Sequence, residues 1–204
     1  MNQGASGGGQ EMAGQRRSHA LQSLARHLES NSGLQVVDFG GLNQQNLDFV
    51  TGLGHRLYAE DLLASYEWFF SQAERAEGTA DDKRINAFLD STIGFATGSV
   101  GAVLAWDRLQ FLFPAATDAL VERLKRVMAP GGLLLAMFHP EQLAKAAPLV
   151  CRITDEGGLT ATPRPPARGA GKFNARAIEK LFADFASVKF YMTRDSLQEV
   201  LIRR

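Results

Sequence analysis

Acidic residues and glycines follow several short apolar runs in this sequence, and their types and spacing could support ligand chemistry. Gly40 and Gly41 have no Cβ, so the backbone there can approach a bound ligand closely. A carboxylate at the end of a neighbouring strand can accept hydrogen bonds from both hydroxyls of a ribose. The pattern favours a nucleoside-binding edge, and its candidate residues are Asp38, Gly40, Gly41, Glu60, Asp61, Asp90, Trp106 and Asp107.

The elements that must position these residues are strands and helices in alternation. Short apolar runs typical of buried strands lie within 34–41 and at 56–59, 85–89, 102–105 and 133–138. Apolar residues at helical spacing predict helices at 44–53, 61–77, 118–128 and 174–185. This alternation predicts an α/β fold with a mainly parallel sheet. The carboxyl ends of the strands would bring the candidate residues to one edge, where open α/β sheets bind ligands.

The chain is predicted to form one domain, residues 16–204, behind a disordered tail, residues 1–15. The tail is rich in Gly, Gln and Ser and has too few apolar side chains to offset the cost of ordering it. A hairpin and a loop at about 150–172 are surplus to the alternation, and we expect them to roof an acceptor pocket at the ligand edge. Two final strands, at 188–192 and 199–202, are expected to pair antiparallel at the sheet edge.

Composition argues against several classes of function. The chain has 22 Lys and Arg against 22 Asp and Glu, so nothing in its net charge favours a nucleic acid or an anionic membrane as partner. One cysteine and four scattered histidines do not make a zinc-type ligand set, and no metal site is expected. No apolar run is long enough to span a bilayer. We therefore expect a cytoplasmic protein.

Several strings resemble the class I S-adenosylmethionine-dependent methyltransferases. The most specific is GSVGAVLAWDRLQFLFPAATDALVERLKRVMAPGGLLLAMF, residues 98–138, which is similar to that family's fourth strand, following helix and fifth strand. VVDFGG, residues 36–41, matches its first glycine loop, and RLYAED, residues 56–61, the end of its second strand. The resemblance implies a Rossmann-like, doubly wound sheet of seven strands with an antiparallel closing hairpin. It also implies S-adenosylmethionine as cofactor, with Glu60 on the ribose and Asp90 or a neighbour on the adenine.

The glycine loop departs from the family's pattern. Leu42 and Gln44 stand where the second and third glycines are expected, and Val100-Gly101 replaces the common Phe-Asp of the fourth strand. Side chains at these positions predict that the loop binds the cofactor more weakly than in the family. The sequence has no Asn/Asp-Pro-Pro-aromatic string, so methylation of adenine in DNA is unsupported.

The residues leave two functions open, and with them the question of whether the chain is an enzyme. The first is methyl transfer to an oxygen, nitrogen or sulfur of a small molecule, which needs little beyond proximity and alignment. The second is a non-catalytic binding or assembly module with a protein partner, favoured by the altered glycine loop. Individual roles are open as well: Glu60 and Asp107 could start helices, Trp106 could be a packing residue, and His139 could be a general base or a wall residue.

Overall fold

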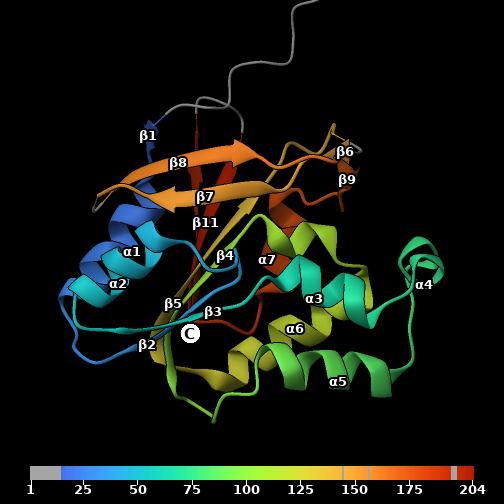
Figure 1. The fold of residues 1–204 in the computed structure, drawn as a ribbon, viewed down its shortest axis with the longest axis horizontal. Coiled ribbons are helices and arrows are strands. Elements are labelled where there is room, and N and C mark those ends of the chain that lie inside the picture. The colour runs from blue at the N-terminus through green and yellow to red at the C-terminus, as the bar shows by residue number, and fades with distance from the viewer. Residues whose placement is uncertain (1–14, 144, 156, 194–196) are drawn as a thin grey trace, which may run out of the picture.

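The computed structural model describes residues 15–143, 145–155, 157–193 and 197–204 (Figure 1). Its main sheet has six strands in the order β10-β11-β5-β4-β2-β3. These strands are β2 (Gln35–Asp38), β3 (Arg56–Ala59), β4 (Val100–Trp106), β5 (Met128–Phe138), β10 (Ser187–Met192) and β11 (Gln198–Arg203).

The four strands β3, β2, β4 and β5 run parallel, whereas β11 and β10 run antiparallel to their neighbours. The alternation of elements and this largely parallel core confirm the α/β fold. Because the parallel strands point the same way, the residues that end β2, β3 and β4 lie along one edge of the sheet.

Helices cover both faces of the main sheet, as Figure 1 shows. One face packs against α1 (His19–Glu29) and α2 (Gln44–Gly52). The other packs against α3 (Leu62–Phe69), α5 (Asp82–Thr92), the 3₁₀ turn η1 (Arg108–Phe111), α6 (Pro114–Val127) and α7 (Ala175–Leu181). A short helix, α4 (Gln72–Glu77), connects α3 to α5. Fully buried apolar strands such as β4 fit this double covering.

The expected third strand, residues 85–89, is wrong, and the sheet has six strands among the described residues rather than seven. The segment lies inside α5, whose buried residues are Ile85, Phe88, Leu89 and Thr92. Their spacing is that of one helix face, and Asp81 caps the helix by accepting a hydrogen bond from the Arg84 amide. As a consequence, Asp90 lies on a helix and does not follow a strand.

A second, smaller sheet lies across the carboxyl ends of the main strands (Figure 1). It consists of β1 (Gln15–Arg17), β8 (Gly158–Pro163) and β7 (Leu149–Ile153), so the hairpin at 149–163 also pairs with the start of the described chain. Gln15, the last residue of the predicted disordered tail, belongs to β1; residues 1–14 lie outside the described residues. Two short strands, β6 (Lys145–Ala146) and β9 (Arg168–Gly169), pair beside it.

Among the described residues, no helix is long and apolar enough to cross a membrane.

Candidate functional site

The turn after β2 is organised around the buried carboxylate of Asp38. Its Oδ1 accepts a hydrogen bond from the Gly40 amide at 2.8 Å. Gly41 has a φ of 83°, a left-handed conformation that favours glycine, and its amide donates to the Glu60 carbonyl at 3.1 Å. The structure therefore brings Asp38, both glycines and the end of β3 together at one edge.

Trp106, the last residue of β4, closes the space beside this turn. Its fully buried indole donates from Nε1 to Oδ1 of Asp38 at 2.6 Å. A Cβ added to Gly40 would lie 3.0 Å from the indole, so the missing side chain makes room for Trp106. Trp106 has a φ of 50°, which is uncommon for a residue other than glycine and persists only where the surroundings enforce it.

Asn46 on α2 ties the same carboxylate to the small sheet above it, a role that the sequence analysis did not identify. Its Nδ2 donates to Oδ2 of Asp38 at 2.7 Å, and its Oδ1 accepts from the Ile153 amide of β7 at 2.9 Å. Asn46 is four residues before the buried Val50, so its helical phase alone indicates an inward-facing amide. The hairpin thus covers the carboxyl end of β2 through buried hydrogen bonds.

Burial shifts the pKa of two groups in this network. Loss of solvent raises the pKa of Asp38, while the hydrogen bonds from Asn46, Gly40 and Trp106 act against that rise. Burial likewise raises the pKa of the Cys151 thiol on β7, and the negative charge of Asp107 adds to the effect. The Cys151 thiol is therefore expected to be unreactive in the closed fold.

Asp107 follows β4 and is satisfied within the protein. Its Oδ1 accepts from Nη1 of Arg108 at 2.5 Å, and its Oδ2 accepts from the Leu149 amide at 2.8 Å. Nε2 of His139 lies 3.1 Å from the same Oδ2, and Nη2 of Arg108 donates to the Leu149 carbonyl at 2.9 Å. Asp107 thus anchors the start of β7, and the His139 ring is held against it.

Glu60 and Asp61 both act at the start of α3. Asp61 is its N-cap, accepting from the Ala64 amide at 3.2 Å, and it pairs with Arg164 at 3.4 Å. Glu60 accepts a hydrogen bond from the Ser65 hydroxyl. Glu60 therefore contacts the first turn of α3, as the helix-start interpretation expects, and it also lines an open groove.

This groove, about 560 Å³ in volume, lies between β3 and the end of α5. It brings Glu60 and Asp90 into one site, although Asp90 also pairs with Arg123 of α6 at 2.7 Å. Tyr58 and Phe95 contact each other edge to face at 5.0 Å between ring centroids. The groove is lined by Val37, Leu57, Tyr58, Ala59, Glu60, Asp90, Ser91, Thr92, Gly94 and Phe95.

The eight candidate residues thus fall into two groups. Asp38, Gly40, Trp106 and Asp107 lie at the carboxyl ends of β2 and β4 under the hairpin, where protein atoms satisfy their polar groups. Glu60 and Asp90 line the open groove. The two groups meet where Gly40 and Asp61 form a backbone bridge and the Gly41 amide donates to the Glu60 carbonyl. Among the described residues, no group of three His, Cys, Asp or Glu side chains could hold a metal ion.

Replacing Asn46 by alanine should loosen the attachment of the β7–β8 hairpin to the turn after β2. The change leaves the Ile153 amide and Asp38 Oδ2 without their partner, which costs about 1–3 kcal/mol. Local opening would expose Cys151, the only cysteine, and raise its rate of labelling by dithionitrobenzoate by about tenfold or more. Asn86→Ala, on the exposed face of α5, is the control. Equal labelling of the two variants would contradict the anchoring role of Asn46.

Comparisons with known proteins bear on the fold. No family model matches the chain, and no curated protein matches it. PH0226 from Pyrococcus horikoshii OT3 is similar over 90% of this chain and 88% of that one, at 9% identity and a TM-score of 0.52.

Two further similar structures are enzymes with bound ligands. One is 1,6-didemethyltoxoflavin-N1-methyltransferase from Burkholderia thailandensis with S-adenosylhomocysteine (11% identity, 91% of this chain and 78% of that one, TM-score 0.47). The other is the amino pentose methyltransferase CalS10 from Micromonospora echinaspora with S-adenosylmethionine (15% identity, 90% and 89%, TM-score 0.45). The strand order and the likeness to PH0226 show that this chain has a Rossmann-like α/β fold, the fold that its resemblance to class I methyltransferases implies.

Proposed function

We propose that this chain is a methyltransferase that uses S-adenosylmethionine and acts on an oxygen, nitrogen or sulfur atom of a small molecule. The observation that carries the proposal is the open groove at the end of β3, which Glu60 and Asp90 both line. Glu60 follows β3, the position from which a carboxylate binds ribose hydroxyls in nucleoside-binding α/β folds. The proposal also rests on the family resemblance of residues 34–204.

The groove fits the adenosine end of this cofactor. Glu60 would accept hydrogen bonds from the ribose hydroxyls, and Asp90 would accept one from the adenine amino group. Tyr58 and Phe95 supply aromatic surface in the same groove, which suits a planar base. A volume of about 560 Å³ falls within the usual range for small-molecule sites.

The turn after β2 leaves no room for the methionine end in the arrangement described. The Trp106 indole occupies the space against Gly40, and its Nε1 uses Oδ1 of Asp38 as an acceptor. Binding of the whole cofactor therefore requires the indole to leave this position. Because that step opposes binding, we expect an affinity below that of family members with an open loop.

The chain's own contribution to transfer would be positioning and exclusion of water. The β7–β8 hairpin lies over the carboxyl ends of β2 and β4, held by Asn46 and Asp107. Methyl transfer to a nucleophile depends mainly on alignment in a dry site, so a roof of this kind suits it. The methyl donor itself supplies the activated carbon when it is bound.

A second candidate function is a non-catalytic binding or assembly module. The specific observation in its favour is the Trp106–Asp38 hydrogen bond at 2.6 Å, by which the protein's own indole fills the space beside Gly40. The two candidates differ in one property, because only the methyltransferase must bind the cofactor. A calorimetric titration with S-adenosylmethionine separates them before any acceptor is known.

Glu60→Ala tests the ribose contact. The variant should bind S-adenosylhomocysteine about tenfold more weakly, since one hydrogen bond to a charged acceptor contributes about 1.4 kcal/mol or more. The dissociation constant is measured by calorimetry, with Glu77→Ala, an exposed carboxylate on α4, as the matched control. If both variants bind like the wild type, the ribose site is wrong although the cofactor assignment stands.

A further inference from the structure

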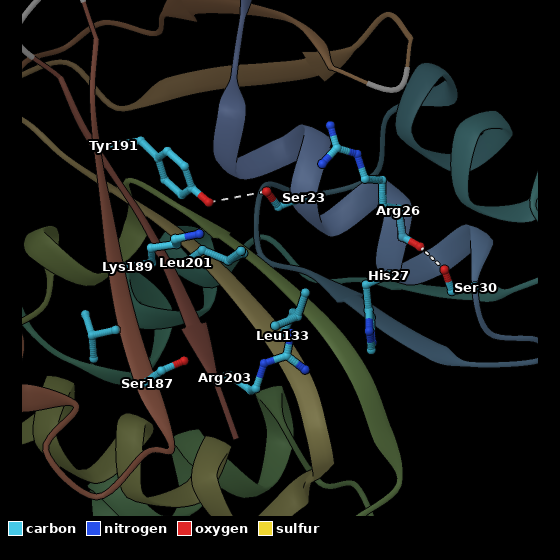
Figure 2. A pocket seen from close by; sticks show the side chains of 11 residues that line it. Ser23, Arg26, His27, Ser30, Leu133, Ser187, Lys189, Tyr191, Leu201 and Arg203 are labelled. Atoms are coloured by element: carbon cyan, nitrogen blue, oxygen red, sulfur yellow. Dashed lines mark hydrogen bonds between the residues drawn. The ribbon is translucent and has the colours of Figure 1, made fainter.

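Figure 2 shows a second pocket, about 580 Å³ in volume. It lies on the sheet face that packs against α1, whereas the groove lies beside α5 on the other face. The pocket is bounded by α1 and by the strands β5, β10 and β11. Leu133 of β5 pairs with Arg203 of β11, and Arg203 pairs with Ser187 of β10. The lining residues are Ser23, Arg26, His27, Ser30, Leu133, Ser187, Val188, Lys189, Tyr191, Leu201 and Arg203. Neither Trp106 nor Glu60 takes part, so this pocket is independent of the proposed cofactor site.

The chain builds the pocket by strand and helix periodicity. Lys189 and Tyr191 are two residues apart on β10, and Leu201 and Arg203 are two residues apart on β11. Residues at this spacing point to the same side of a strand, so all four share the sheet face that packs against α1. Figure 2 shows the Tyr191 hydroxyl directed at Ser23 of α1, and their oxygens are 3.3 Å apart. Two apolar side chains, Leu133 and Leu201, also line the pocket.

The lining carries positive charge without compensation. None of its residues is Asp or Glu, and among the described residues Arg26, Lys189 and Arg203 make no ion pair. Nη1 of Arg203 donates to the Gly131 carbonyl, at 3.3 Å. Nζ of Lys189 lies over the Tyr191 ring, 5.7 Å from its centroid. Clustered cations with hydroxyl donors form a site for an anionic group.

His27 adds an unpartnered polar atom at the same place. Its Nε2 is buried and has no hydrogen-bond partner among the described residues, which is uncommon for a buried nitrogen. Burial lowers the pKa of His27, the nearby Gly101 backbone acts against this, and the charges of Arg203 and His55 lower the pKa further. An anion near Arg203 would reverse part of this effect.

We propose that this pocket binds a small organic dianion with an apolar body. Its charged group meets Lys189 and Arg203, with the Ser23 and Tyr191 hydroxyls as further donors, and its apolar part rests on Leu133 and Leu201. The volume matches a small molecule, and the zero net charge of the chain does not favour a nucleic acid as the source of the charge. A phosphate ester and a dicarboxylate share this chemistry.

Calorimetry with four probes tests the proposal: phenyl phosphate, benzylmalonate, inorganic phosphate and benzyl alcohol. The full chain should bind at least one aromatic dianion with a dissociation constant of about 1 mM or lower, and benzyl alcohol about tenfold more weakly. Tighter binding of phenyl phosphate supports the phosphate source, and tighter binding of benzylmalonate supports the dicarboxylate source. No binding of either dianion, or equal binding of benzyl alcohol, overturns the proposal.

Variants locate the site. Lys189→Met and Arg203→Met should each weaken binding of the dianion by about tenfold, because each removes one charged donor. Lys83→Met, an exposed lysine on α5, is the matched control and should bind like the wild type. Melting curves of all three variants show whether each is folded. Unchanged affinity in both Lys189→Met and Arg203→Met contradicts the assignment.

The His27 pKa provides a second readout that needs no substitution. Titration followed by NMR should show the His27 pKa rising when the dianion is bound, because negative charge favours the protonated ring. The same titration with benzyl alcohol in place of the dianion is the control and should leave the His27 pKa as in the free protein. Binding that leaves the His27 pKa unchanged contradicts this location of the anion.

Discussion

Replacing Asp107 by alanine is expected to lower the free energy of unfolding by about 3–5 kcal/mol, since it leaves a buried charge unpaired. Arg108 is 3% exposed, and its Nη1 lies 2.5 Å from Asp107 Oδ1. The same substitution removes the acceptor of the Leu149 amide, so the start of β7 loses its anchor as well. Denaturant unfolding followed by circular dichroism measures the loss.

Two controls separate the ion pair from a general effect of substitution. Asp118→Ala, an exposed carboxylate on α6, should change stability by less than about 0.5 kcal/mol. The double variant Asp107→Leu with Arg108→Met removes both charges and should recover part of the loss. A loss below about 1 kcal/mol for Asp107→Ala would show that the pair is not buried in solution.

Replacing Trp106 by alanine should have two opposite effects. The free energy of unfolding should fall by about 3–5 kcal/mol, the usual range for removing a fully buried tryptophan. Affinity for S-adenosylhomocysteine should rise by about tenfold or more, because no indole then has to leave its position beside Gly40 before the ligand binds. Trp106→Leu, which keeps apolar volume but cannot donate to Asp38, should bind more tightly with a smaller loss of stability.

Trp68→Ala is the matched control for the tryptophan variants. Trp68 is 78% exposed on α3, so its removal should leave both stability and affinity nearly unchanged. Calorimetry gives the affinities, and thermal melts give the stabilities. If Trp106→Ala is folded and binds no better than the wild type, the indole does not block the cofactor.

Much of the fold could be predicted from the sequence because the apolar runs that favour strands locally are also the segments that the sheet buries. Apolar runs at 34–41, 102–105 and 133–138 predicted strands, and β2, β4 and β5 occupy these segments. The error at 85–89 arose because five residues with four apolar positions fit either a strand or one helix face. Asp81 and the spacing through Thr92 decide for the helix, and both lie outside the short window.

The candidate site was harder to predict because its partners come from distant segments. Position 106 reads as an ordinary packing residue, and only the fold places its indole against Gly40, 66 positions earlier in the chain. Asn46 shows the same limit, since its contacts to Asp38 and Ile153 depend on where β7 lies. The glycines and carboxylates of the sequence indicated that the ligand edge lies at the carboxyl ends of the strands. Hydrogen bonds of Asp38 with Trp106 and Asn46, and of Asn46 with β7, decide that the part at β2 is covered and the groove beside β3 is open.

Calorimetric titration of the wild-type chain with S-adenosylmethionine and S-adenosylhomocysteine decides between the methyltransferase and the non-catalytic module. Both ligands should bind saturably to one shared site, with dissociation constants of about 0.1–1 mM. No heat and no thermal shift at millimolar concentrations of either ligand would contradict the methyltransferase proposal and favour the non-catalytic module.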